Sequence, residues 1–276
     1  MGLPVDIPAS CAVDDLSPDI LQSLGHYTDM LRFLRRNDGK VSTRPGERVY
    51  AIGDIHGRHD LFRTLVRKII AHWENGSQNF RRVELVLLGD IIDRGPHSAA
   101  CLDFAYKLVS RSRVRLLKGN HEDLLLNSID GNAVAQDIWL EHGGLAFLES
   151  FGIEPPRADE DSFDFGERIG AAVPDHVLAM LREAPLTYRS GDYLFVHAGV
   201  RPGVAIDRQR EEDLMCIRDD FTQSGRDHGA VIVHGHSIVG DVEFHRNRIA
   251  VDTGAYASER LSCVCLDGTS RETIHT

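Results

Sequence analysis

The sequence has few cysteines, no long apolar run and fewer basic than acidic residues. Its five cysteines are odd in number and include no C-x-x-C pair, which argues against a disulfide framework. No apolar run approaches the roughly 18 residues of a membrane-spanning helix, so we expect none. The N-terminal residues MGLPVDIPAS also lack the basic start and apolar stretch of a signal peptide. We therefore expect a cytoplasmic protein.

The charge balance argues against two classes of partner. The chain has 31 Lys and Arg residues against 42 Asp and Glu residues, and its formal net charge is −11. Nucleic acids and anionic membranes are bound by clustered Lys and Arg side chains. We therefore expect neither a nucleic-acid surface nor a membrane surface. With 276 residues, the chain can bury a substantial core without disulfides or structural metals, and its length does not require more than one domain.

The first part of the chain, residues 1–47, is interpreted as an N-terminal helical extension. Ser17 can act as an N-cap, and Pro18 suits the first position of a helix. Leucines then follow at near-helical spacing, and Gly39 marks the end, so we predict a helix over about 18–36. It could pack on the main domain, pair with another chain or cover the site. The sequence does not choose between these roles or give an oligomeric state.

The main domain is predicted over residues 48–276, where apolar strands alternate with glycine-containing loops and helices. The expected strands cover 48–52, 83–88, 114–117, 193–196, 230–233, 248–251 and 261–266. Continuous apolar strands separated by helices indicate a sheet that is buried on both faces. Further helices are expected between about 136 and 183, divided by a polar loop over 154–164.

Five of the predicted strands end in a glycine next to a carboxylate, amide or imidazole. The sequences are GDIHG, GDIIDRG, GNHE, HAG and HGH. In an open α/β sheet the carboxyl ends of the strands lie along one edge, so these loops can converge. The candidate metal ligands at the five ends are Asp54, His56, Asp90, Asn120, His197 and His236.

These six residues predict a metal site of a particular kind. They provide hard oxygen and imidazole nitrogen atoms and no thiolate, a set that suits Mn, Fe or Zn better than Ca. Six ligands exceed what one catalytic ion with an open position uses, so we expect two divalent ions that share a carboxylate. Such a pair would hold a bridging water and make hydroxide available near neutral pH. From the strand pattern alone, His234 competes with His236 for one ligand position.

Three further residues lie beside the expected ligands. Arg94 follows Asp90 by four residues, where its guanidinium could bind phosphate oxygens through two hydrogen bonds. His121 directly follows Asn120, and we expect it to point elsewhere and to protonate a leaving oxygen, with Asp93 orienting it. The alternatives are ordinary Asx turns for the ligand cluster, a capping or loop histidine, and an arginine in a surface salt bridge.

The five motifs, in this order, resemble the phosphoprotein phosphatase family of the calcineurin-like metallophosphoesterases. The segment WLEHGGLAFLESFG also resembles the bacterial branch of that family. The similarity spans roughly residues 48–267. It implies an α/β fold in which a β-sandwich is flanked by helices on both outer faces.

The resemblance also implies a role for each matching metal ligand. Asp54 and His56 would serve the first ion, and Asp90 would bridge the two ions. The second ion would take Asn120, His197 and His236, so the family pattern favours His236 over His234. The expected metal is manganese, with iron or zinc as alternatives.

For the substrate, the resemblance implies that Arg94 holds the phosphate and that Asp93 and His121 form the acid pair. The second phosphate-binding arginine of bacterial members usually sits in a Leu-x-Trp-x-Arg stretch. The sequence LMCIR matches it only if Cys216 replaces the tryptophan, which would make Arg218 the second arginine. Tyr256 is a candidate for lining the cleft.

The predicted function is a serine/threonine-type protein phosphatase that hydrolyses phosphomonoesters by in-line attack of a metal-bridging hydroxide. A symmetrical diadenosine tetraphosphate hydrolase shares the same motifs and is the alternative. A metal-binding docking protein without catalysis is a third possibility, although no expected ligand or acid is missing from the chain. The substrate is accordingly a phosphorylated protein or a small phosphate-containing molecule. A preference for Ser/Thr or Tyr phosphopeptides stays open.

Overall fold

The computed structural model of the chain describes residues 40–76, 81–111 and 113–276. The predicted helix over about 18–36 therefore lies outside the described residues. Residues 41–46 belong to the same compact unit as the main domain. There, the backbone amide of Thr43 donates to the carbonyl of Gly268, and that of Ser42 donates to the Asp192 carboxylate. The predicted domain boundary at residue 47 stays a prediction.

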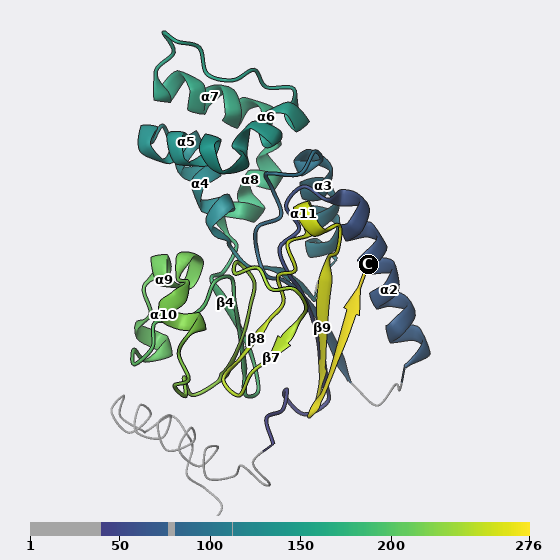
Figure 1. Cartoon of the computed structure of the whole chain (residues 1–276). Helices are drawn as coiled ribbons and strands as arrows, with labels where there is room; N and C mark the ends of the chain where they lie inside the picture. The colour runs from purple at the N-terminus through teal and green to yellow at the C-terminus, as the bar shows by residue number, and fades with distance from the viewer. Residues whose placement is uncertain (1–39, 77–80, 112) are drawn as a thin grey trace, which may run out of the picture. The chain divides into compact units, whose positions relative to one another are not determined.

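Two five-stranded sheets form the centre of this unit (Figure 1). The first has the strand order β10-β9-β1-β2-β3, and the second has the order β4-β5-β6-β8-β7. Strands β1, β2 and β3 run parallel, as do β5, β6 and β8. The bounds in the first sheet are β1 (Glu47–Ile52), β2 (Arg82–Leu87), β3 (Val114–Leu116), β9 (Ser262–Asp267) and β10 (Ser270–His275). Those in the second are β4 (Thr187–Ser190), β5 (Tyr193–Val196), β6 (Val231–His234), β7 (Glu243–Phe244) and β8 (Arg248–Ala250).

The alternation of side chains along each strand produces three apolar layers. In β1, Val49 and Ala51 pack between the two sheets, whereas Tyr50 and Ile52 pack against helices on the outer face. Ile232, in β6, belongs to the outer layer of the second sheet. The central strands β1, β5, β6 and β9 are therefore buried on both faces, which explains why they read as continuous apolar runs.

Helices cover both outer faces of the sandwich, as the family resemblance implies. Helices α2 (His59–Asn75) and α3 (Ser98–Val109) pack on the first sheet, and α9 (Glu211–Cys216) and α10 (Asp219–Thr222) pack on the second (Figure 1). A further group of helices gathers at one end of the sandwich (Figure 1). Its members are α4 (Asn120–Ile129), α5 (Ala133–Trp139), η3 (Leu140–Gly144), α6 (Leu145–Phe151), α7 (Ser162–Ala172) and α8 (Asp175–Arg182). The short elements η4 (Ile206–Arg208) and α11 (Ala255–Ser258) lie in later loops.

All seven predicted strands are present, but the predicted loop over 154–164 is wrong at its C-terminal end. Helix α7 begins at Ser162, and the side chain of Asp161 caps it by accepting a hydrogen bond from the Asp164 amide. The side chains of Phe165 and Ile169 are buried on the inner face of this helix. The acidic residues before it, Asp159, Glu160 and Asp161, give the segment the composition of a loop, and this composition hides the start of the helix.

Among the described residues, no helix combines the length and the apolar character needed to cross a bilayer.

Two loops that lead to the candidate site cross each other at a pair of glycines. Gly57 has a φ of +65°, and a Cβ atom there would overlap the carbonyl oxygen of Gly95. A Cβ atom on Gly95 would overlap the carbonyl oxygen of His56, which accepts a hydrogen bond from the Gly95 amide. Neither position has room for a side chain, so the two glycines fix how closely the loops after β1 and β2 approach each other.

We expect Gly57→Ala to lower the free energy of unfolding by at least about 2 kcal/mol, because it combines a left-handed backbone with a steric overlap. Urea denaturation measures the change. Gly240→Ala is the matched control, since no described atom lies within 4 Å of a Cβ atom there and its φ is outside the left-handed region. Equal stability of the two variants would contradict the role given to the crossing.

Candidate metal centre

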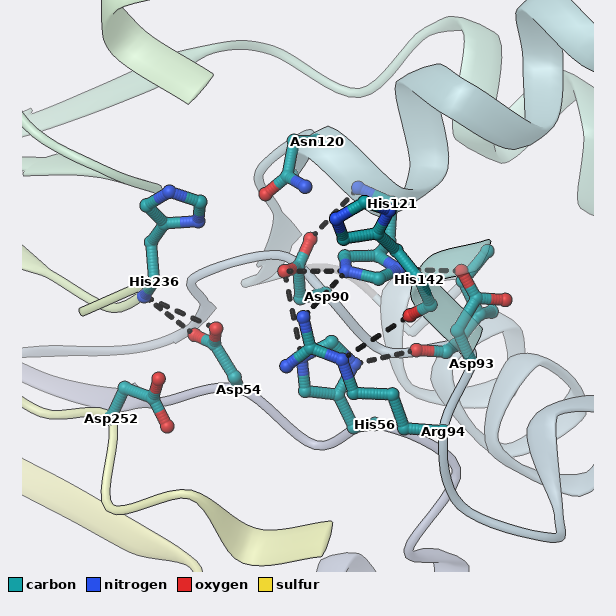
Figure 2. A network of polar contacts seen from close by, with 12 residues as sticks. Asp54, His56, Asp90, Asp93, Arg94, Asn120, His121, His142, His236 and Asp252 are labelled. Atoms are coloured by element: carbon teal, nitrogen blue, oxygen red, sulfur yellow. Dashed lines mark hydrogen bonds and ion pairs between the residues drawn. The ribbon is translucent and has the colours of Figure 1, made fainter. Parts of the chain in front are cut away.

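Side chains from five strand ends meet at one edge of the sandwich. Asp54 and His56 follow β1, and Asp90 follows β2. Asn120 is the first residue of α4, just after β3, while His197 and His236 follow β5 and β6. Figure 2 shows how closely five of these side chains lie, with Asp90 between Asn120 and His56. The structure therefore brings together all six residues that the sequence predicts as ligands.

The carboxylate of Asp90 lies at the centre of this cluster. Its Oδ2 atom is 3.4 Å from Nε2 of His197 and 3.7 Å from Nε2 of His56. Nε2 of His121 is 3.9 Å from the same oxygen. Asp90 is only 1% exposed, so three imidazoles surround one buried carboxylate.

The remaining candidate ligands extend from Asp90 toward the second sheet. Nε2 of His197 lies 3.0 Å from Oδ1 of Asn120 and 3.2 Å from Nδ1 of His236. Both carboxylate oxygens of Asp54 lie 3.1 Å from the backbone amide of His236, which donates to them (Figure 2). A carboxylate from the first sheet thus holds the loop that carries a histidine of the second.

Backbone strain is concentrated in these loops. Among the described residues, seven non-glycine residues have φ in the left-handed region. Five of the seven are predicted site residues: His56, Asp90, Asp93, Arg94 and His236. Such conformations persist only where the surrounding structure enforces them, and they cluster at functional sites. The observed strain therefore points to the same residues as the sequence motifs.

The histidines are oriented as metal ligands usually are. Nδ1 of His56 bonds to the carbonyl of Ile92, and Nδ1 of His197 bonds to that of Leu88, each at 2.8 Å. A ligating histidine commonly bonds through its other ring nitrogen in this way. Within the described part of the chain, the buried Nε2 atoms of His56 and His236 have no hydrogen-bond partner. Bound cations would provide partners for these two nitrogen atoms.

Two groups of donor atoms could each hold an ion, and they share Asp90. His56, Asp90 and His121 form one group, and Asp90, His197 and His236 form the other, with the donor atoms of each group within 4.8 Å of one another. The donors are oxygen and nitrogen without sulfur, as borderline divalent ions prefer. The residues present therefore fit a pair of divalent ions.

The protonation states of the histidines follow from burial and from the carboxylates. Burial lowers the pKa of both His56 and His236 to about 3, so both rings are neutral, as metal ligands must be. Burial alone would also lower the pKa of His197, but the nearby carboxylates, Asp90 above all, outweigh it and raise the pKa to about 10.

Sequence reasoning gave no role to two buried carboxylates at the site. Glu122 accepts hydrogen bonds from the backbone amides of Asp90, Ile91 and Gly119, and so fixes the loop after β2 to the start of α4. A glutamate three residues after the N-cap is a known capping signal and could have revealed this contact. Asp252 lies beside Asp54, and burial raises its pKa to about 6. Its position became visible only in the fold.

The predicted acid pair is in contact. Nδ1 of His121 lies 2.6 Å from Oδ2 of Asp93, and both side chains are at most 1% exposed. Nη2 of Arg94 lies 3.1 Å from Nε2 of His121, and its guanidinium carbon lies 4.8 Å from the centre of the Tyr256 ring. The indole of Trp139 also donates to Asp93, a contact that the sequence did not suggest.

A cavity of about 340 Å³ opens beside this cluster. Its lining includes both predicted phosphate-binding arginines, Arg94 and Arg218, together with Asn120, His121, His142 and His236. His234 lies elsewhere: it is fully buried, and its ring packs edge-on against Phe221. Of the two competing histidines, His236 is therefore the one that joins the site.

Comparison with known families agrees with this geometry. The model of the calcineurin-like phosphoesterases matches residues 47–261, which include every candidate site residue. The chain belongs to this family. It is a metal-dependent phosphoesterase, and its two-sheet architecture is the fold of this family.

Several curated relatives and solved structures cover most of the chain. A protein of Anoxybacillus flavithermus is 27% identical over 233 residues, spanning 77% of this chain and 88% of the relative. One of Bacillus mycoides is 24% identical and spans 76% and 87%. Both are named bis(5'-nucleosyl)-tetraphosphatase PrpE (asymmetrical).

Two solved structures share the fold at 20% identity. The first, provisionally described as a diadenosine tetraphosphatase, has a TM-score of 0.56 and covers 86% of this chain and 98% of that chain. The second, a cold-active protein tyrosine phosphatase, has a TM-score of 0.53 and covers 84% and 81%.

We expect the calcineurin-like phosphoesterase to bind two Mn²⁺ ions per chain. Asp90→Asn should weaken this binding at least tenfold, because the variant loses a charge that both groups of donor atoms share. Titration calorimetry and elemental analysis measure affinity and stoichiometry. Asp103→Asn, which changes an exposed carboxylate paired with Lys107, should leave both unchanged. If Asp90→Asn still bound two ions tightly, the role of Asp90 as a ligand shared by both ions would be contradicted.

Proposed function

We propose that this phosphoesterase hydrolyses dinucleoside tetraphosphates asymmetrically, giving a nucleoside triphosphate and a nucleoside monophosphate. The observation that carries the proposal is the shared name of relatives that match about three quarters of this chain. Their names favour the alternative derived from the sequence over its first choice, a serine/threonine-type protein phosphatase. They also favour the asymmetrical over the symmetrical reaction.

In this proposal, six residues hold two divalent ions. The ligands are Asp54, His56, Asp90, Asn120, His197 and His236. Manganese is the proposed metal because oxygen and imidazole donors without thiolate suit it. When bound, two such ions would lower the pKa of a water molecule and make a nucleophile available near neutral pH.

The residues beside the ions bind the phosphates and move the proton. Arg94 and Arg218 line the same cavity and would bind phosphoryl oxygens of the substrate. The distance of 3.1 Å between Nη2 of Arg94 and Nε2 of His121 supports the assignment of both residues to one phosphoryl group. A water molecule forms the new P–O bond and releases a proton to solvent, and the bond to the leaving oxygen breaks. His121 gives a proton from Nε2 to that oxygen, while Asp93 accepts the hydrogen bond of Nδ1.

The contacts of Arg94 support its assignment to phosphate. Its guanidinium faces the Tyr256 ring, and its backbone amide donates to the carbonyl of Gly143 at 3.2 Å. The first contact orients the guanidinium and the second fixes the backbone of Arg94, while the cationic end of the side chain stays at the cavity. A preorganised guanidinium loses less conformational entropy when it binds phosphate.

We also propose that the protein acts in the cytoplasm. All four cysteines within the described residues are free thiols, and three of them, Cys101, Cys263 and Cys265, are buried in the core. Unpaired thiols of this kind are typical of a reducing compartment.

The direct test compares diadenosine tetraphosphate, p-nitrophenyl phosphate and phosphoserine and phosphotyrosine peptides with the manganese-loaded enzyme. We expect the highest kcat/KM for the dinucleotide, with ATP and AMP as products separated by ion-exchange chromatography. Two ADP molecules would instead show the symmetrical reaction, and a higher kcat/KM for a phosphopeptide would favour the protein phosphatase.

Two arginine variants test whether the measured activity comes from this site. Arg94→Lys should lower kcat/KM at least about tenfold, because lysine cannot form the two parallel hydrogen bonds of a guanidinium. Arg63→Lys, on the exposed face of α2, should leave it unchanged. Hydrolysis of none of the substrates with metals bound would support the docking protein instead.

A further inference from the structure

The segment Trp139–Gly144 is a sequence motif to which the proposed reaction assigns no role. Trp139 ends helix α5 and is fully buried in the apolar layer outside the first sheet. Its polar atom is nevertheless paired: Nε1 donates to Oδ2 of Asp93 at 2.9 Å. The indole therefore connects the group of helices at the end of the sandwich to the acid pair.

The contact is made to one particular oxygen. Oδ2 of Asp93 accepts from both Trp139 and Nδ1 of His121, whereas Oδ1 is buried and has no partner among the described residues. The backbone amide of Asp93 donates to Oγ of Ser98, but this contact does not restrain the carboxylate. Among the described residues, the two donors on Oδ2 provide the hydrogen bonds that fix the rotation of the carboxylate. Without the indole, the carboxylate could turn its unpaired oxygen toward His121 and shift the imidazole with it.

The position of the indole is itself enforced by the residues around it. The ring of Phe147 packs edge-on against it, with 5.4 Å between ring centres. Gly144 lies so close that a Cβ atom there would be 2.6 Å from Cδ2 of Trp139. The preceding residue, Gly143, has a φ of 121° and accepts the backbone hydrogen bond of Arg94. One short segment therefore contacts both Asp93 and Arg94.

We propose that Trp139 is a positioning residue that fixes the Asp93 carboxylate, and through it the His121 imidazole, in the orientation needed for proton donation. The proposal rests on the acid role proposed for His121, but it does not depend on the dinucleotide as substrate. An indole is suited to this task because it donates one hydrogen bond, accepts none, and fills its apolar site.

The consequence is a dependence on the leaving group. Proton donation matters most when the departing oxygen is strongly basic, and matters little when the leaving group is stable as an anion. Loss of the Trp139 hydrogen bond should therefore slow phenyl phosphate far more than p-nitrophenyl phosphate. A general loosening of the fold would slow both equally.

The first test is Trp139→Phe, which keeps an aromatic ring and removes the N–H donor. We expect kcat for phenyl phosphate to fall about 10- to 100-fold, the range for a hydrogen bond to a charged group, and kcat for p-nitrophenyl phosphate to fall less than about threefold. His121→Asn should show the same selectivity more strongly. Trp73→Phe, which removes the chain's other indole N–H group, in helix α2, should not show it. Equal losses on both substrates for Trp139→Phe would overturn the proposal.

A double-mutant cycle separates action through Asp93 from an independent effect. In an Asp93→Asn background, Trp139→Phe should change kcat for phenyl phosphate less than about twofold, because the contact is already lost. The full effect of Trp139→Phe in that background would show that the tryptophan acts by another route.

A spectroscopic test is independent of turnover. The chain has two tryptophans, so the indole region of a ¹H–¹⁵N spectrum contains two signals. We expect Asp93→Asn to shift the Trp139 signal and speed its hydrogen exchange, while the signal of Trp73 in α2 stays in place. An unchanged Trp139 signal would overturn the positioning role of Trp139, whether or not any nucleotide is a substrate. This proposal and the proposed dinucleotide substrate therefore fail separately.

Discussion

The site depends on one buried carboxylate, that of Asp90, held among three imidazoles. Burial alone would raise its pKa, but His197 and His121 outweigh this effect and hold the pKa well below its usual range. Its backbone is in the left-handed region, and its amide donates to Glu122. Gly119 lies so close that a Cβ atom there would overlap the carboxylate. The fold thus holds a buried negative charge at this edge of the sandwich in a strained backbone conformation. Bound cations would stabilise that charge.

The parallel strands explain why this charge can be surrounded so closely. Strands β1, β2 and β3 deliver oxygen and nitrogen donors from the first sheet, and β5 and β6 deliver histidines from the second. Because each loop leaves a hydrogen-bonded strand of the sandwich, the donors start from rigid positions. The group of helices at the end of the sandwich then contributes Trp139 and the wall of the cavity, including Leu124 and Ile138.

The sequence could predict the donors because each lies within a few residues of a strand end, where chain order implies position. The same reasoning could not find Trp139, since its partner Asp93 is 46 residues away and only the packing of α5 brings them together. The start of helix α7 was predicted as loop because acidic residues precede it, whereas the stability of this helix comes from burying Phe165 and Ile169. Local pattern therefore gives the chemistry at the strand ends, and tertiary contacts decide how each group is oriented.

The most direct test of the metal centre is anomalous diffraction from crystals grown with Mn²⁺. Two anomalous peaks are expected, both within coordination distance of Asp90. One peak should also contact Asp54 and His56, and the other His197 and His236. A single peak away from Asp90, or no peak at this edge of the sandwich at saturating manganese, would contradict the account.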